Sequence, residues 1–139
     1  MYLLDTNVVS ELRRVRAGKA APGVMRWADS VEASDLYLSV VTIEELEIGV
    51  LLVERKDIQQ GALLRAWLMR QVLPAFGDRI LPIDTAVALR SAELHVPDPG
   101  PIRDCYIAAT ALEHRLTVVT RNVADFATKH VQILDPWSV

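Results

Sequence analysis

Acidic residues recur at one kind of position in this sequence, directly after a short apolar stretch or about one helical turn beyond it. Asp5 follows the first such stretch, and Glu45 comes soon after the second. Asp104 begins a helical stretch after a proline-rich loop, and Asp125 follows a later apolar stretch. Carboxylates that lie within a few ångströms repel one another, so they either hold protons or bind cations. Oxygen ligands alone suit Mg²⁺ or Mn²⁺ and not zinc, so these residues predict a divalent-cation site.

Other reaction chemistries find little support in the sequence. It contains neither a Gly-x-Ser-x-Gly turn nor a Gly-x-x-x-x-Gly-Lys-Ser/Thr loop, which removes the commonest serine hydrolases and nucleotide-binding proteins. His95, His114 and His130 show no metal-ligand spacing and are interpreted as surface or helix-end residues. Cys105 is the only cysteine, and packing as a small buried residue explains it better than nucleophilic chemistry.

Each acidic residue also has a purely structural interpretation. Aspartate is a preferred N-cap, so Asp5, Asp104 and Asp125 would each be suited to accept backbone N–H bonds at a helix start. Thr42 and Glu45 have the Thr-x-x-Glu spacing of a capping box. Helix capping alone does not explain why acidic residues recur at one edge of the predicted structure. This recurrence favours a cation-binding site.

The elements that must position these residues are strands separated by helices. Strands are predicted at Tyr2–Leu4, Leu36–Val41, Arg79–Asp84, Leu116–Thr120 and Val131–Leu134. Helices are predicted at Thr6–Val15, from Pro22 to about Val31, from Thr42 to about Arg55, and at Ile58–Leu73, Asp84–Leu94 and Asp104–Glu113. Asp84 has no further supporting feature and is interpreted as a helix cap only. This alternation predicts a three-layer α/β/α sandwich with a mainly parallel sheet, whose sites lie at the carboxyl ends of the strands.

Composition predicts one globular domain over residues 1–139, because 51% of the residues are hydrophobic and 24% are charged. The apolar run Leu36–Ile43 is too short to cross a membrane, and no secretory signal is visible, so a cytoplasmic protein is expected. The net charge of −3 argues against binding nucleic acid through a generally basic surface. A local cluster of Arg13, Arg14, Arg16 and Lys19 is better explained as a solvated helix end than as a phosphate site.

Three stretches together carry a family resemblance. MYLLDTNVVSEL, SVVTIEELEIGV and RDCYIAATALEHRLTVVTRNVADF resemble, in this order, the signature blocks of PIN-domain ribonucleases, in particular VapC-type toxins of bacterial toxin–antitoxin pairs. The resemblance covers almost the whole chain and implies a PIN-like α/β/α sandwich with an acidic pocket for Mg²⁺ or Mn²⁺.

The resemblance assigns roles residue by residue. Asp5, Glu45, Asp104 and Asp125 match the first to fourth acids of the family, which makes them the expected metal ligands and catalytic residues. The fourth acid is the least uniform position in the family. The polar positions that support the acids or a water between them are matched by Thr6, Asn7, Thr42, Thr120 and Asn122.

The reaction implied is hydrolysis of RNA phosphodiester bonds, with an activated water attacking in line. Single-stranded or loop RNA is the expected substrate, because unpaired bases are accessible. Arg103, Arg121 and the basic cluster near the N-terminus are expected to frame the RNA groove. The resemblance further implies a homodimer and a cognate antitoxin protein that blocks the acidic pocket.

Departures from the family pattern are small. Arg115 stands where relatives often have a glycine at a helix end, which puts the left-handed cap of that turn in doubt. Cys105 and Tyr106 replace small or aliphatic residues after the third acid. Two other classes share features with this sequence. A receiver-like metal-binding domain would need a paired acid at Asp5 and a late lysine, and in a non-catalytic binding protein the acids would be caps.

Overall fold

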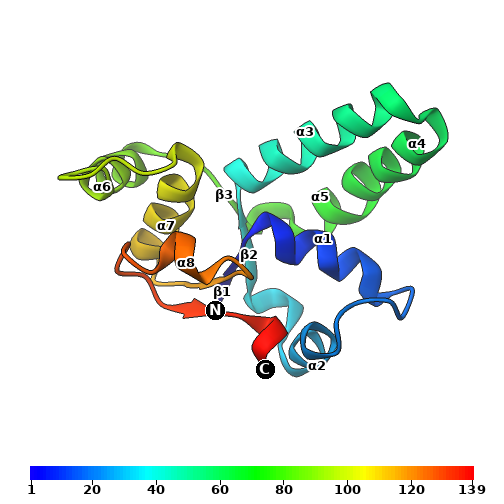
Figure 1. Cartoon of the computed structure of the whole chain (residues 1–139), viewed down its shortest axis with the longest axis horizontal. Helices are drawn as coiled ribbons and strands as arrows, with labels where there is room; N and C mark the ends of the chain where they lie inside the picture. The colour runs from blue at the N-terminus through cyan, green and yellow to red at the C-terminus, as the bar shows by residue number, and fades with distance from the viewer.

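A computed structural model describes all residues, 1–139. Its centre is a sheet of five parallel strands in the order β3-β2-β1-β4-β5 (Figure 1). The strands are β1 Tyr2–Leu4, β2 Leu36–Ser39, β3 Ile80–Leu81, β4 Thr117–Val119 and β5 Ile133–Leu134. The α/β class and the parallel sheet predicted from the sequence are therefore confirmed.

Helices connect the strands and cover both faces of the sheet (Figure 1). They are α1 Thr6–Val15, α2 Pro22–Ser30, α3 Val40–Lys56, α4 Ile58–Trp67, α5 Leu73–Phe76, α6 Thr85–Leu94, α7 Ile102–His114 and α8 Val123–Phe126. Short 3₁₀ turns lie at Ala33–Asp35, Gly77–Arg79 and Pro136–Ser138, and a π-helical turn lies at Leu68–Val72. No helix is long and apolar enough to cross a membrane.

The pleat of the strands divides the core into two layers. Successive side chains of a strand point to opposite faces of the sheet. Leu4 and Val119 belong to a buried cluster with side chains of α1, α2 and α3, whereas Leu3 and Val118 belong to a second cluster with α7 and α8. The α/β/α layering thus follows from adjacent apolar residues in β1 and β4.

The strand order places a crevice at the carboxyl end of β1. From β1 the chain crosses to β2 on one side, and β4 pairs with β1 on the other. Ligands of open parallel sheets bind where the order reverses in this way, outside the carboxyl ends of the strands. Asp5 directly follows β1, and its backbone N–H still donates to the carbonyl of Val119 at 2.9 Å.

The second strand is shorter than predicted. It ends at Ser39, and Val40 and Val41 already belong to α3. Ser39 is the N-cap of this helix, and its hydroxyl accepts a 3.0 Å bond from the N–H of Val41. Val40 and Val41 are apolar and β-branched like strand residues, so the sequence pattern predicted a longer strand and did not indicate a cap at Ser39.

The helical stretch that begins with α4 was predicted to end at about Leu73, near Pro74 and Gly77. It continues past Pro74 and ends at Phe76, directly before Gly77. The π-helical turn shifts the pairing, so that the N–H of Leu73 bonds to the carbonyl of Leu68. Gly77 ends the helix with a φ of 47°, a conformation that glycine adopts at little cost.

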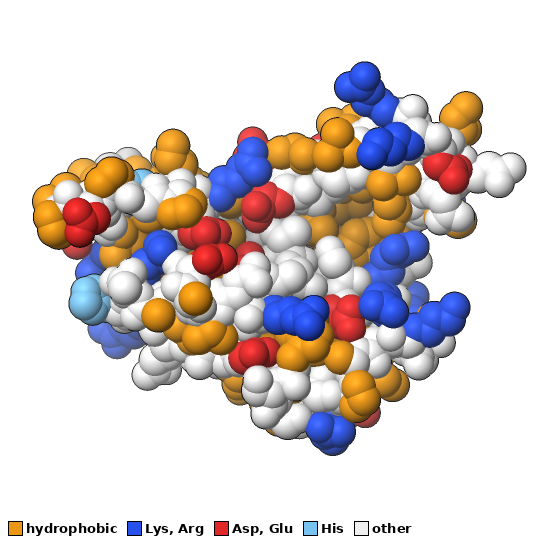
Figure 2. All heavy atoms as spheres, in the orientation of Figure 1, with side chains coloured by type: hydrophobic (Ala, Val, Ile, Leu, Met, Phe, Trp, Pro, Cys, Tyr) orange, Lys and Arg blue, Asp and Glu red, His pale blue; other side chains and the backbone are white.

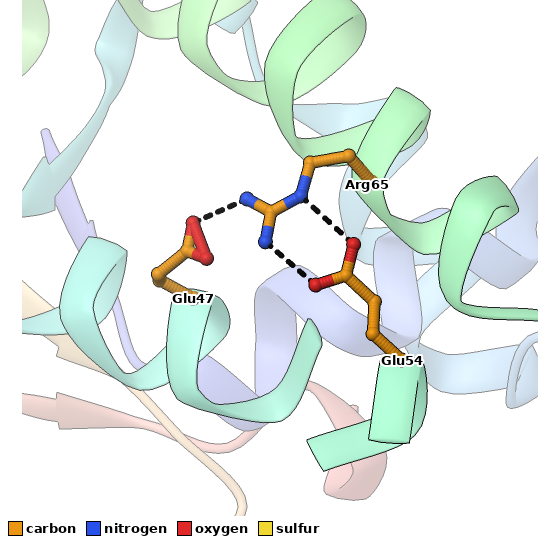
Figure 3. A network of polar contacts seen from close by, with 3 residues as sticks. All are labelled: Glu47, Glu54 and Arg65. Atoms are coloured by element: carbon orange, nitrogen blue, oxygen red, sulfur yellow. Dashed lines mark hydrogen bonds and ion pairs between the residues drawn. The ribbon is translucent and has the colours of Figure 1, made fainter. Parts of the chain in front are cut away.

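Helices α3 and α4 form a hairpin that projects from the sheet (Figure 1). Arg65 of α4 bonds to Glu54 of α3 through Nε at 3.3 Å and Nη2 at 3.0 Å, and it also bonds to Glu47 (Figure 3). A Cβ on Gly61 would lie 2.7 Å from the Cα of Glu54, so the two helices approach at a position that only glycine fits.

Candidate metal-binding active site

Asp5 directly follows β1 at the carboxyl edge of the sheet and is only 6% exposed. Its Oδ1 accepts from the N–H of Thr6 at 2.8 Å, which makes Asp5 the N-cap of α1 as well as a site candidate. Its Oδ2 accepts from the hydroxyl of Thr120 at 2.8 Å and from the side-chain amide of Asn7 at 3.2 Å. Three donors from two elements therefore fix the orientation of this buried carboxylate.

Asn7 and Thr120 extend this network into the loop that follows β4. The Oδ1 of Asn7 accepts from the backbone N–H of Arg121 at 3.1 Å. The hydroxyl of Thr120 accepts from the backbone N–H of Asn122 at 3.0 Å. The network ties the start of α1 to the start of α8, although more than a hundred residues separate them in sequence. Asn122 contributes through its backbone, and its side chain makes no capping bond.

Glu45 joins the site from the second turn of α3. Its Oε1 accepts from the hydroxyl of Thr6 at 2.7 Å. The predicted capping box of Thr42 with Glu45 is wrong, because Ser39 caps α3 and Glu45 turns instead toward α1. Thr6 thus orients the second acid and gives its backbone N–H to the first.

Thr42 is an unexplained polar residue beside this site. Its side chain is fully buried, and its hydroxyl has no hydrogen-bond partner. A buried polar group without a partner costs roughly 1–3 kcal/mol, so its retention here needs a reason. The position lies one turn before Glu45 on the same helix.

Asp104 stands in the first turn of α7. The helix begins one residue after Pro101, so Asp104 is not its N-cap, and the capping alternative is wrong for this residue. Its pKa is raised above the ordinary value of 3.8, first by burial and then by the negative charges of Asp5 and Asp125, with a smaller contribution from Glu45. Asp5, Asp125 and Glu45 therefore all lie close enough to Asp104 for their charges to disfavour its ionised form.

Asp125 lies in α8 and is the most exposed of these acids. Asn122 occupies the N-cap position of that helix, so capping does not account for Asp125 either. Its backbone carbonyl accepts a bond from the ammonium group of Lys129, a lysine that is only 8% exposed. The charge of Lys129 partly offsets the raised pKa of Asp104.

The donor chemistry of the cluster fits a hard divalent cation. All four side chains offer oxygen, and they come from the N-terminal parts of four different helices. No three acidic, histidine or cysteine side chains stand close enough together to enclose an ion directly. Mg²⁺ commonly keeps several waters and takes one or two carboxylates, so this spacing fits a hydrated ion. The repulsion that raises the pKa of Asp104 agrees with a bound cation, whose positive charge would relieve it.

Other sequence interpretations are confirmed. Asp84 caps α6 by accepting from the N–H of Val87 at 2.9 Å. Cys105 is buried, and burial raises the pKa of its thiol, which makes it a poor nucleophile. His95 ends α6, where its Nδ1 accepts from the N–H of Gly100 at 3.3 Å. The doubt about the left-handed cap at Arg115 was wrong, because Arg115 adopts that conformation with φ 57° and ψ 46°.

Two charged groups near the site were not assigned precise roles from the sequence. Lys129 was missed, although it follows Asp125 by four residues, a spacing that places side chains on the same face of a helix. Arg103 was expected only to frame a groove, but its guanidinium faces Glu44 at 3.6 Å and Glu45 at 4.0 Å. Figure 2 shows acidic and basic side chains side by side on this face of the molecule.

Comparison with known proteins agrees with this geometry. The family model described as "PIN domain" matches residues 2–129. The chain is 40% identical over 146 residues to "Toxin FitB" of Neisseria gonorrhoeae, covering 99% of both chains. It is 35% identical over 145 residues to "VapC ribonuclease Y4jK" of Sinorhizobium fredii, covering 99% of this chain and 98% of the relative.

Solved structures lead to the same family. The crystal structure of FitAcB from Neisseria gonorrhoeae matches with a TM-score of 0.89 and 38% identity over 100% of both chains. A toxin–antitoxin complex from Klebsiella pneumoniae matches with a TM-score of 0.69 and 26% identity, again over 100% of both chains. With the predicted blocks, the fold and these matches in agreement, the chain belongs to the PIN domain family.

Proposed function

We propose that this protein is the toxin of a toxin–antitoxin pair and acts as a divalent-metal-dependent endoribonuclease. The observation that carries the proposal is that Asp5, Asp125 and Glu45 lie near enough to the half-buried Asp104 for their negative charges to raise its pKa. The names of the relatives, a toxin and a ribonuclease, support the same activity. Mg²⁺ is the proposed ion, and Mn²⁺ offers the same oxygen-ligand chemistry.

The ion would supply phosphate-charge neutralisation and a lowered pKa for an attacking water. Asp5, Glu45 and Asp104 would hold it, directly or through water, and Asp125 would complete the acidic rim. Thr6, Asn7 and Thr120 hold the first two acids in fixed orientations, as their hydrogen bonds indicate. This fixed orientation matters because a misplaced ligand lowers the rate of cleavage even when the ion still binds.

The substrate of the proposed reaction is single-stranded or loop RNA. Unpaired bases leave the backbone accessible to a narrow crevice, whereas a duplex presents its phosphates on a stiff, wide helix. The basic side chains at the end of α1 would extend the groove: Arg13 lies 5.9 Å above the ring of Trp67, and Arg16 bonds to Gln71 at 3.2 Å. Arg13 and Arg14 also occupy the last turn of α1, the helix-end position expected from the sequence.

The partners proposed are a cognate antitoxin and a second copy of this chain. The similar structure from Klebsiella pneumoniae is a toxin–antitoxin complex, which supports the first partner. A homodimer would let two net-acidic chains share one basic RNA groove. The buried single thiol of Cys105 agrees with the reducing cytoplasm proposed for this protein.

The test is a metal titration joined to a cleavage assay. Calorimetry with Mn²⁺ and gel analysis of labelled total tRNA and mRNA, each with and without EDTA, would compare the wild type with Asp104→Ala. Uptake of the ion and EDTA-sensitive cleavage by the wild type are expected, and both should be lost in the variant.

Asp84→Ala is the matched control, because Asp84 is an acid at a helix start that caps α6 and makes no contact with the site acids. It should lower stability but retain cleavage. A folded wild type that takes up no ion and cleaves none of these RNAs would contradict the proposal and favour a non-catalytic binding role.

A further inference from the structure

Arg103 is the accessible cation of the acidic crevice. It directly precedes Asp104 in the first turn of α7, and its side chain is 51% exposed. The other cation beside the acids, Lys129, is only 8% exposed and donates to the carbonyl of Asp125. An incoming anion can therefore reach Arg103 far more readily than Lys129.

The contacts of Arg103 are loose. Its Nε lies 3.6 Å from an oxygen of Glu44 and its Nη1 lies 4.0 Å from Oε2 of Glu45, distances beyond those of hydrogen bonds. Arg65, by contrast, makes hydrogen bonds to two carboxylates through all three of its nitrogens (Figure 3). Exposed ion pairs without hydrogen bonds contribute little stability, so the donors of Arg103 remain available.

Glu45 is shared between Arg103 and the proposed metal site. Its Oε1 accepts from Thr6, which leaves Oε2 facing the guanidinium. A divalent cation that draws in Glu45 would take this carboxylate away from Arg103 and leave the guanidinium with only the exposed Glu44. The planar fork of arginine matches two oxygens of a phosphate, which makes phosphate a natural replacement.

The surroundings of Arg103 leave room for such a ligand. The side chain borders an open hollow of about 580 Å³ between the starts of α3 and α7. The hollow is lined by Val40, Val41, Glu44, Ile83, Ile102, Arg103 and Tyr106. An RNA strand that passes the acidic residues would meet this hollow next, because Arg103 and Glu44 line it.

We infer that Arg103 binds an RNA phosphate next to the cleaved one, and that Glu44 and Glu45 hold it in the free protein. The inference rests on the proposed ribonuclease function and adds a residue that acts on the substrate and not on the ion. A phosphate-binding role explains why Arg103 lies beside Glu44 and Glu45 without forming hydrogen bonds to them.

The experiment compares Arg103→Ala and Arg103→Lys with the wild type. Arg55→Ala is the matched control, since Arg55 is an exposed arginine near the opposite end of α3, about 20 Å from Val40. Circular dichroism checks folding, and calorimetry measures Mn²⁺ binding. The probe for RNA binding is a short fluorescein-labelled single-stranded RNA of mixed sequence, followed by anisotropy in Ca²⁺ where gels show no cleavage.

Arg103→Ala should weaken RNA binding at least about tenfold and reduce the slope of log affinity against log salt by about 0.7, the value for one phosphate contact on a single strand. Arg103→Lys should restore the slope, because it keeps the charge, but only part of the affinity, because it loses the fork. Mn²⁺ binding should be unchanged or tighter, because Glu45 loses a competing cation.

Unchanged RNA affinity and salt slope in Arg103→Ala, in a protein whose wild type cleaves RNA, would overturn the inference. Loss of Mn²⁺ binding would also overturn it, since Arg103 would then act by organising Glu45. A wild type without metal-dependent cleavage would instead contradict the proposed function, so the two failures are distinguishable.

Discussion

The hydroxyl of Thr120 donates a 2.8 Å hydrogen bond to Oδ2 of Asp5, a residue 115 positions away in sequence. Both side chains are buried where β1 and β4 end side by side. Thr120 also accepts from the N–H of Asn122. One threonine therefore fixes the buried acid and the start of the loop that carries Asp125.

Replacing this threonine should cost stability. Thr120→Val removes a donor to a carboxylate and an acceptor for a backbone N–H, with an expected loss of about 2–3 kcal/mol in the free energy of unfolding. Urea unfolding in EDTA measures it. Thr42→Val is the matched control, because the hydroxyl of Thr42 is equally buried but unpaired. It should raise the free energy of unfolding by about 1 kcal/mol in EDTA, because it removes a buried polar group that has no partner. Equal effects of the two variants on stability would show that the hydrogen bonds of the Thr120 hydroxyl do not stabilise the protein.

Asp104→Asn should stabilise the metal-free protein while abolishing function. Folding raises the pKa of Asp104, so this group contributes stability below its ordinary pKa of 3.8 and loses that contribution as the pH rises through the folded value. The advantage of the asparagine variant should therefore be absent at low pH and grow above pH 3.8. Unfolding curves in EDTA over a pH series measure it, with Asp84→Asn as the control.

The same Asp104→Asn substitution should lower catalytic activity, although it raises stability. Removal of a carboxylate that holds the ion is expected to lower kcat/KM by about 100-fold or more, since several kcal/mol of charge stabilisation are lost. A variant that is less stable than the wild type at neutral pH would contradict the repulsion inferred among the acids.

The sequence predicted the parallel α/β architecture because the alternation of apolar strands with amphipathic helices is local and strong. It predicted the order of the acids along the chain, but not which of them were caps. Asp5 is both a cap and a site candidate, and the Thr42–Glu45 spacing suggested a box that Ser39 makes unnecessary. The turn of Glu45 toward Thr6 depends on how α1 and α3 pack, and no local pattern encodes such a contact.

The ion-pair network of Arg65 should give a pH-dependent contribution to stability. The hydrogen bond from Arg65 lowers the pKa of Glu47 below its ordinary value of 4.5. A lowered pKa contributes stability above 4.5, and this contribution is lost as the pH falls through the folded value. Arg65→Met should therefore destabilise the protein at pH 7, and the difference from the wild type should shrink below pH 4.5.

Urea unfolding across this pH range measures the difference. Arg70→Met is the control, because Arg70 is an exposed arginine in the π-helical turn that follows α4. The network lies on the projecting α3–α4 hairpin, so cleavage should be less affected than stability. A difference that persists unchanged in acid would show that the packing of the Arg65 stem, and not its charge, holds the hairpin.

Arg115 offers a stabilising substitution outside the site. It ends α7 in the left-handed conformation, which costs a residue with a Cβ about 1–2 kcal/mol. Glycine avoids this strain but has more freedom in the unfolded chain, so Arg115→Gly should stabilise the protein by up to about 1 kcal/mol. Arg115→Ala keeps the strain and should bring no such gain. Thermal unfolding of the two variants measures the contrast, and equal melting temperatures would show that the exposed arginine side chain, and not the backbone, determines stability at this turn.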